Sequence, residues 1–327
     1  MTKPLPSPPG SPGQGTEAFL QGQTHQERTV AARGAYERYL NRFGWFCVAP
    51  SVLFFSVFMA YPIISSLYYV TRRWKGTVNT FIGLGNFVRM ARDNVFQAAL
   101  GHNFIFMVIQ VPIMVFLALL LAVLLNQGIR RFRGALRLAI FLPSVTSLVV
   151  VSVLFRVLLQ TNGFLNNVML SAHLIPAPIG WLSDAFWAKV TIILAITWRW
   201  TGYNMVFFLV GLQSLDPQIF EAAEVDGASK VRQFFTITVP LLVPIILFSA
   251  VTSTSGTMQL IEEPNILTFQ GGPSNATMTA ALYIYRQAFF VNFDFGYATS
   301  MSYIVVLISG ILAFIQLRLL GGERRAS

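Results

Sequence analysis

The chain has 327 residues, of which 54% are hydrophobic and only 11% are charged, and its mean hydropathy is +0.60. A soluble domain of this length could not bury so much apolar surface, so a lipid bilayer must be the solvent for most of the chain. The formal charge of +10 indicates cytoplasmic loops and contacts with anionic lipid rather than nucleic-acid binding, and the single cysteine, Cys47, excludes an intrachain disulfide.

The N-terminal segment precedes any long apolar run. Residues 1–33 are rich in Pro, Gly, Ser and Gln, which predicts a disordered cytoplasmic tail. Residues 34–44 place Tyr36, Tyr39 and Phe43 at helical spacing, which predicts a short amphipathic helix in the membrane interface. An ordinary flank of the first span is the alternative.

Six apolar segments follow, each long enough to cross about 30 Å of hydrocarbon. They lie at about 45–70, 102–126, 138–159, 188–212, 238–260 and 296–317. The sequence therefore predicts an all-α polytopic membrane protein, with a six-helix transmembrane domain over 45–320 and a short tail at 321–327. A cytoplasmic loop of two short helices is expected between the fourth and fifth spans.

The distribution of Lys and Arg predicts the orientation of these spans. With the N-terminus inside, fourteen of the 23 Lys and Arg residues fall in inside segments, including the dense cluster from Arg130 to Arg137. The first outside loop opposes this assignment with five basic residues, but the cluster occupies a much shorter loop. Both termini are therefore expected in the cytoplasm.

The segment 216–240 carries strong signals for the start and end of helices. Asp216 can cap a helix that has Pro217 at its first position, and Gly227 can adopt the positive φ that ends it. Ser229 can cap a second helix. These residues predict two short helices with a bend between them, and by themselves they also describe an ordinary amphipathic hairpin.

The same segment carries a longer motif: Glu221-Ala222-Ala223, then Asp226-Gly227-Ala228 after two residues, with Phe234, Ile237 and Pro240 beyond. The motif resembles the "EAA" loop of permeases from binding-protein-dependent ABC importers. In that family this loop is a coupling helix that sits in a cleft of the ATPase subunit. The resemblance implies a coupling role for Glu221, Ala222, Ala223, Asp226 and Gly227. Glu221 would pair with a basic group of the ATPase, and a merely solvated helix face is the alternative for Glu221 and Glu224.

Other segments are similar to first-type permeases of carbohydrate importers, of the maltose, lactose and glycerol-phosphate kind. They include Tyr61-Pro62 and the stretches 81–87, 211–213 and 263–273, and the resemblance covers roughly residues 45–320. One departure is the stretch 268–273, where many relatives have an uninterrupted glycine run.

This resemblance implies a multi-pass protein of the bacterial inner membrane that acts with several partners. They are a second homologous permease, two ABC ATPase subunits, an extracytoplasmic sugar-binding protein, the sugar itself and membrane lipid. The chain has no G-x-x-x-x-G-K-[ST] stretch with which to cradle phosphates, so ATP and Mg are expected on the ATPase subunits and no catalytic, cofactor or metal site is expected here.

Polar residues inside the spans are candidates for a transport path, because polar groups in hydrocarbon are costly and usually face a bundle interior or a water-filled cavity. The fourth span contributes Trp198, Arg199, Gly202, Tyr203 and Asn204. Arg199 is near mid-membrane and needs a partner, so a structural salt bridge with Glu262 or with another helix is the alternative to a role in the path.

The fifth span contributes a dense run of hydroxyl residues, from which we select Ser253, Thr254, Thr257 and Gln259, together with Glu262 just beyond it. Small hydroxyl residues often join transmembrane helices, which is the competing explanation for each of them. By resemblance, the sugar-contact region of first-type permeases lies on these two spans.

The sequence thus predicts the permease subunit of an ATP-driven sugar importer. A polyol or glycerol phosphate is the alternative cargo, and Arg199 would favour an anion if it were unpaired. An ion-coupled secondary transporter would show inverted repeats and intramembrane carboxylates, and a membrane enzyme would show a catalytic set. The sequence has few acids within its spans and no such set.

Overall fold

A computed structural model describes residues 39, 41–75, 77–127 and 133–321, which form two compact units divided after Leu67. Residues 41–55 and the π-helical turn η1 (Ser56–Ala60) lead into α2 (Tyr61–Val70), giving one helix of 30 residues that belongs to the first unit up to Leu67. Residues 41–44 belong to this helix, so the described part of the expected interfacial segment continues directly into the first span. The predicted tail at 1–33 lies outside the described residues.

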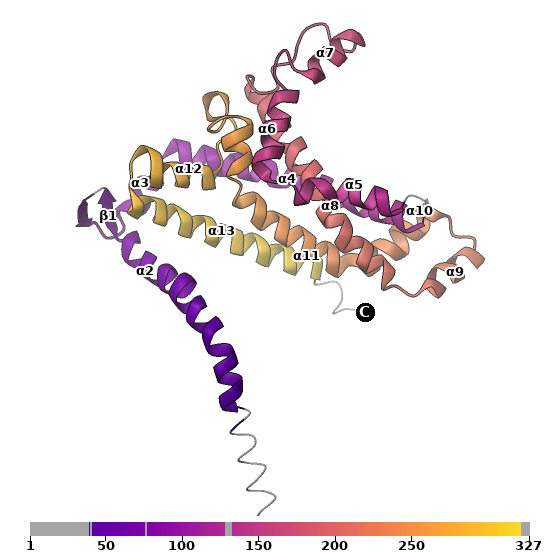
Figure 1. Cartoon of the computed structure of the whole chain (residues 1–327), viewed down its shortest axis with the longest axis horizontal. Coiled ribbons are helices and arrows are strands. Elements are labelled where there is room, and N and C mark those ends of the chain that lie inside the picture. The colour runs from indigo at the N-terminus through magenta and orange to yellow at the C-terminus, as the bar shows by residue number, and fades with distance from the viewer. Residues whose placement is uncertain (1–38, 40, 76, 128–132, 322–327) are drawn as a thin grey trace, which may run out of the picture. The chain divides into compact units, whose positions relative to one another are not determined.

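The second unit contains most of the helices and a small hairpin of strands (Figure 1). Its early elements are β1 (Arg72–Lys75), β2 (Val78–Phe81), α3 (Gly85–Met90), α4 (Asn94–Gln127), α5 (Arg133–Val145), α6 (Leu148–Leu158), α7 (Phe164–Ser171) and α8 (Ala185–Gln213). The later ones are α9 (Pro217–Val225), α10 (Lys230–Gln233), η2 (Phe234–Thr238), α11 (Val239–Met258), η3 (Glu263–Leu267), η4 (Pro273–Asn275), α12 (Ala280–Arg286), η5 (Gln287–Val291) and α13 (Phe295–Gly321).

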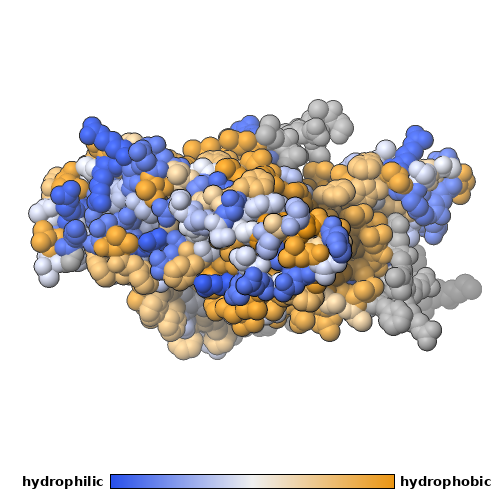
Figure 2. All heavy atoms as spheres, turned by 90° about the horizontal axis from the view of Figure 1, so that it is seen from above, coloured by the Kyte–Doolittle hydropathy of each residue, from blue (hydrophilic) through white to orange (hydrophobic). Residues whose placement is uncertain are grey.

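Five of the described helices are long and apolar enough to cross a membrane, and a bent pair supplies a sixth candidate span. The prediction of a helical polytopic membrane protein is confirmed. The antiparallel hairpin, in which Arg72 pairs with Phe81, was not predicted. In Figure 2 hydrophilic residues gather on the left, where Figure 1 places α3 and the strands, and on the right, where it places α9.

The helices α4, α8 and α11 pack together at the centre of the second unit. Ala118 and Ala122, one turn apart on α4, are fully buried and share a core with Phe208 of α8 and Leu242 of α11. In lipid no hydrophobic force holds helices together, and small residues allow the close packing that does. This contact helps to fix the position of the polar residues that line a cavity further along the same three helices.

The predicted third span, 138–159, is not one straight helix. It is divided into α5 and α6, which are bent by 98° at the break after Val145. Pro143 lies in the last turn of α5, where it lacks an N–H and crowds the preceding turn, and Ser147 has the extended ψ of 132° that starts a new helix. The apolar pattern predicts a span in this region, and it carries no signal for the bend.

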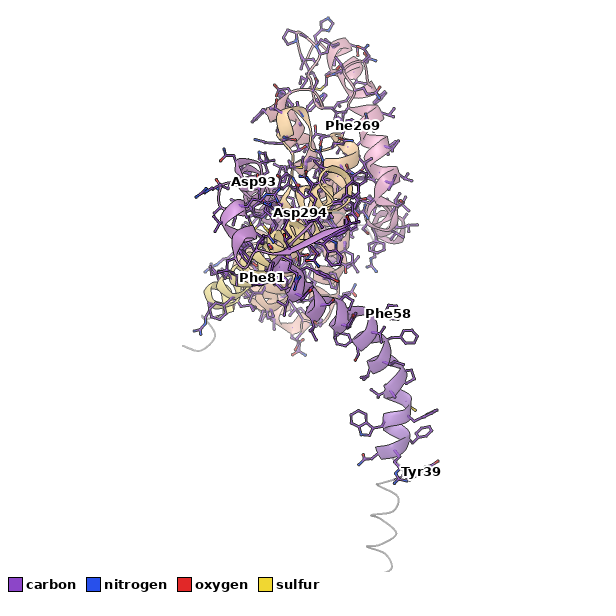
Figure 3. The ribbon with its side chains drawn as sticks, turned by 90° about the vertical axis from the view of Figure 1, so that its left-hand side faces the viewer. Tyr39, Phe58, Phe81, Asp93, Phe269 and Asp294 are labelled. Carbon is purple, nitrogen blue, oxygen red and sulfur yellow. The ribbon has the colours of Figure 1, made fainter. Side chains whose placement is uncertain are left out.

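A buried polar cluster joins the starts of α4 and α13 to α12. Asp93 accepts hydrogen bonds from the hydroxyls of Tyr283 (2.7 Å) and Tyr297 (2.6 Å), and Arg89 forms an ion pair of 2.7 Å with Asp294, which lies near Asp93 in Figure 3. Burial raises the pKa of Asp93, but bonds from both tyrosines and two backbone N–H groups outweigh it and hold the pKa below its usual value. Burial, and then the bond to Asp93, raises the pKa of Tyr283 to about 12.

The loop around α7 is organised by one asparagine. Asn166 is fully buried, and its amide donates to the carbonyls of Thr161 (2.9 Å) and Ile179 (2.9 Å). Its oxygen accepts from the Ile179 N–H (3.1 Å) and the indole of Trp181 (3.0 Å). These bonds tie the two ends of the loop together.

We predict that Asn166→Ala loosens this loop, because it leaves buried donors and acceptors unpaired at a cost of about 1–3 kcal/mol. Cleavage within residues 161–183 in limited proteolysis of the purified protein should become about tenfold faster. Asn167→Ala is the matched control, since Asn167 is exposed and its side-chain amide donates to the Asn162 carbonyl at 3.3 Å. Equal cleavage rates for the two variants would contradict this role of Asn166.

Candidate functional site

A cavity of about 220 Å³ lies among α4, α8, α11 and the segment that follows α11. Six of the ten predicted path residues line it: Tyr203, Asn204, Ser253, Thr257, Gln259 and Glu262. The lining also includes Gln110, Trp200, Thr252, Gly256 and Glu263. Its three aliphatic residues are Leu148, Ile196 and Leu260. The cavity is therefore lined by hydroxyls, amides, carboxylates and two aromatic rings.

Hydrogen bonds between the helices hold the polar lining in place. Asn204 on α8 accepts from the Ser249 hydroxyl at 2.6 Å, and its amide donates to the Trp200 carbonyl at 3.0 Å. Gln110 on α4 accepts from the Thr257 hydroxyl at 3.3 Å. The sequence left helix joining and path lining as alternatives for these polar residues. Asn204 and Thr257 have both roles, since they join helices and also line the cavity.

The other four predicted path residues lie outside the cavity lining. Gly202 faces α5, where an added Cβ would be 1.9 Å from the Ile140 carbonyl oxygen. Thr254 is buried and accepts a hydrogen bond of 2.7 Å from the Gln316 amide of α13. Trp198 packs on Phe155 with 5.3 Å between ring centroids. These three residues serve helix packing in this structure.

Arg199 is the fourth of these residues. Its guanidinium carbon lies 5.6 Å from the centre of the Trp200 ring, and its Nε and Nη1 atoms are buried without a hydrogen-bond partner among the described residues. The salt bridge with Glu262 that the sequence left open is absent, because the ion pairs within the described residues are Arg89 with Asp294 and Lys230 with Glu224.

Sequence reasoning missed several lining positions. Trp200, Tyr203 and Asn204 are three and four residues apart and so share one face of α8, a spacing that could have drawn Trp200 into the predicted set. Gln110 is a polar residue inside the second predicted span, and that position is the signal that could have added it to the set. Glu263 gave no usable signal, because its burial depends on how the segment after α11 folds back.

The loop between α8 and α11 has the local structure that its sequence predicts. Asp216 caps α9 through the Gln218 N–H at 2.9 Å, Pro217 is the first helical residue, and Gly227 has a φ of +75°. Ser229 caps the next helix, but that helix is not separate: α10, η2 and α11 form one helix of 29 residues from Lys230 to Met258.

The proposed coupling residues lie on the exposed helix α9 and the turn that follows it. No residue of α9 is buried; Glu221, Ala222, Asp226 and Gly227 are exposed, and Ala223 is half-buried. Glu224 forms an ion pair with Lys230 across the turn. Beside α9 lies a hollow of about 560 Å³ that is lined in part by Phe220 and Glu221. The structure thus presents a short, unburied helix at the end of two long ones.

Together these features define a polytopic helical membrane protein with a polar cavity inside its bundle and an exposed helical loop at one end. Residues 82–323 match the family described as "Binding-protein-dependent transport system inner membrane component". The chain belongs to this family, and it is therefore a component of a binding-protein-dependent transport system rather than an ion-coupled secondary transporter.

The chain is similar to two named permeases in particular. It is 47% identical over 288 residues to the lactose transport system permease protein LacF of Rhizobium radiobacter, covering 88% of this chain and 97% of that protein. It is 30% identical over 278 residues to the arabinooligosaccharides transport system permease protein AraP of Bacillus subtilis, covering 84% and 87%.

Among solved structures, a chain of a bacterial ABC transporter involved in the import of the acidic polysaccharide alginate aligns with a TM-score of 0.77. Its sequence is 21% identical, and the match covers 90% of this chain and 99% of that one. At this identity the similarity shows the fold.

Proposed function

We propose that this chain is the permease subunit of an ATP-driven sugar importer of the bacterial inner membrane. The observation that carries the choice of sugar is the 47% identity to a lactose transport permease across nearly the whole of both chains. The partners would be a second, homologous permease, two ABC ATPase subunits and an extracytoplasmic sugar-binding protein.

The cavity supports this proposal by its chemistry. Small-molecule sites combine apolar and aromatic walls with a few polar groups that fix the ligand's orientation. Trp200 and Tyr203 supply aromatic surface, and Gln110, Thr257 and Asn204 supply hydrogen-bonding groups. A volume of about 220 Å³ lies below the usual range of about 300–1,000 Å³, so we propose that the second permease completes the site.

The exposed loop supports the assignment of coupling to Glu221, Ala222, Ala223, Asp226 and Gly227. An apolar residue in the same helix, Val225, is 88% exposed, which is costly unless another protein covers it. We propose that α9 docks on an ATPase subunit, which holds ATP and Mg, so that closure of the ATPases moves this loop and changes which side of the membrane the cavity faces.

The orientation with both termini in the cytoplasm follows from this proposal and from the charge distribution, because α9 must then lie on the cytoplasmic side with the Arg130 to Arg137 cluster.

A substitution that fills the cavity tests whether the cavity lies on the transport path. A Cβ added at Gly256 meets no atom within 4 Å, so Gly256→Leu should fold normally and place its side chain in the cavity. We expect uptake of labelled lactose to fall at least about tenfold in cells that express the complete complex, since a methylene group alters selectivity of a pocket by about 10–200-fold. The control is Gly101→Leu on exposed α4 surface, where a Cβ also meets no atom. Wild-type uptake by Gly256→Leu would remove the cavity from the path.

Substitutions in the exposed loop test its proposed role in coupling. Gly227→Val should misdirect the turn after α9, because a β-branched residue resists positive φ at a cost of about 1–2 kcal/mol, although its side chain has open space. Glu221→Lys should place like charges in the contact with the ATPase. Both variants should insert in the membrane but lose most of the ATPase activity that the binding protein stimulates in the reconstituted complex.

Gly227→Asn is the matched control for this experiment, because asparagine tolerates positive φ and should retain most of the stimulation. If Gly227→Val and Glu221→Lys are stimulated like the wild type, the assignment of coupling to this loop is wrong.

Cysteine labelling tests the proposed orientation. In a background with Cys47 replaced by Ser, Gly134→Cys should react with a membrane-impermeant thiol reagent in inside-out vesicles and not in intact cells. Gly134 is exposed, and an added Cβ meets no atom within 4 Å, so the substitution should not disturb α5. Labelling in intact cells would reverse the proposed orientation.

A further inference from the structure

A basic surface lies at the end of the bundle that is opposite α9, where hydrophilic residues gather around α3 and the strands (Figure 1, Figure 2). Its five basic residues are Arg72, Arg73, Lys75, Arg89 and Arg92. Arg89 forms an ion pair with Asp294. Arg73, Lys75 and Arg92 are exposed, and the ion pairs within the described residues include none of them. In the proposed orientation these charges are extracytoplasmic, against the usual distribution in membrane proteins.

The backbone that carries these charges is held in place by buried contacts. Asn86 is 1% exposed, and its amide donates to the carbonyls of Val70 (3.0 Å) and Arg72 (2.8 Å). The Arg72 guanidinium lies over the Tyr68 ring, 4.2 Å from its centre. The start of α13 packs so closely that a Cβ on Gly296 would be 1.9 Å from the Arg72 carbonyl oxygen. The basic surface is therefore a fixed part of the second unit.

The ends of the spans place this surface at the level of the lipid headgroups. The first span ends at Val70, two residues before the first arginine, and α4 begins at Asn94, two residues after Arg92. Headgroups form a layer of roughly 5–7 Å on each side of the hydrocarbon core, so residues this close to the ends of spans lie within it. Trp74 packs on Tyr69 with 4.8 Å between ring centroids, and such aromatic residues gather at this level.

Exposed apolar side chains accompany the basic ones. Phe81 at the end of the hairpin is 71% exposed, and Leu84 and Val88 are 69% and 55% exposed. Leu84 and Val88 are four residues apart, so they share one face of the α3 region. Beside them is a hollow of about 530 Å³ that is lined by Gly85, Val88, Arg89, Arg92 and Asp93. Apolar and basic groups side by side suit the boundary between acyl chains and anionic headgroups.

Two acids contact this surface, and both are already engaged. The Asp93 carboxylate accepts hydrogen bonds from the hydroxyls of Tyr283 and Tyr297. Asp294 is only 1% exposed and is paired with Arg89. The five basic residues and these two acids leave a net charge of +3. An anion that approaches the surface therefore meets net positive charge.

We propose that this surface, formed by β1, β2, α3 and the turn at Arg92, binds the anionic headgroups of phospholipids. The phosphate oxygens accept hydrogen bonds from Arg73, Lys75 and Arg92, because arginine and lysine donors match phosphate in charge and geometry. Phe81 and Leu84 lie among the upper parts of the acyl chains. A soluble acidic protein would have to enter the headgroup layer to reach these groups, whereas the headgroups are already there.

The lipid beside this surface can be identified by fluorescence quenching in vesicles. Leu84→Cys carries a small apolar fluorophore in the complete transporter complex, from which Cys47 and the other reactive cysteines have been removed. The complex is reconstituted with brominated phosphatidylglycerol or, at equal mole fraction, with brominated phosphatidylcholine. Bromine quenches on contact, so the ratio of the two signals gives the local preference for the anionic lipid. We expect a preference of at least about fivefold, which is the contribution of one basic residue near an anionic surface.

Removal of the unpaired charges should abolish this preference. In the triple variant Arg73→Gln, Lys75→Gln and Arg92→Gln we expect the ratio to fall to about one, since the headgroup loses its charged donors. All three positions are exposed, so the substitutions should not disturb the fold. A salt series on the parent complex is a second measurement that needs no variant. Because salt screens exposed charges, the preference should also fall toward one in about 1 M NaCl.

The matched control removes the same amount of charge from the other ends of the helices. It combines Arg42→Gln, Arg232→Gln and Arg318→Gln, all at exposed positions. This variant should keep the preference of the parent complex, because its substitutions are far along the helices from the labelled position.

Either of two results would overturn the lipid assignment. The first is a ratio near one in the parent complex, or an equal preference in the parent and the triple variant. The second is a parent ratio near one together with loss, in the triple variant, of the ATPase activity that the binding protein stimulates, in which case the charges serve an acidic protein partner. Sugar uptake is not part of the readout, so failure of the proposed transport function would leave the lipid result unchanged.

Discussion

The structure depends on one constraint of the membrane interior, which is that a polar group there must find its partner within the protein. Asn204 bonds Ser249 across α8 and α11, and Gln110 bonds Thr257 across α4 and α11. Asn103 of α4 also donates to the Thr257 carbonyl, at 2.7 Å. These bonds hold the three central helices in register beside the polar cavity, which Asn204, Gln110 and Thr257 also line.

The same helices connect the cavity to the exposed loop. One helix runs from Lys230, beside Gly227, to Met258, next to the cavity residue Thr257. A displacement of the loop would therefore act on the same helix that ends at the cavity, and the π-helical turn η2 and Pro244 are the points where this helix can bend. The proposed coupling and the proposed path are thus two ends of one structural element.

The segment after α11 places Glu262 and Glu263 of the cavity lining through unusual backbone geometry. Phe269, Gln270, Gly271 and Gly272 all have positive φ, and the Gly271 N–H donates to the Pro264 carbonyl at 2.9 Å. Thr268 also bonds the Thr277 hydroxyl, at 2.6 Å. Residues in such conformations persist only where the surroundings hold them, and they gather at functional sites. The tight fold of this segment explains why Glu263 is buried at the cavity.

The sequence alone determined the class of protein, the positions of most spans and the caps at Asp216 and Ser229, because these depend on local composition and on a residue's own hydrogen bonds. It could not show the bend after Val145, the packing of Gly202 against α5 or that Arg199 forms no ion pair with any of the described residues. Those features depend on which helices pack against each other. Helical periodicity predicts the face on which a residue lies, but it does not determine which helix packs against that face. Only the tertiary structure brought Glu263 to Trp200 and Gln110, since the three lie on separate elements that meet through folding.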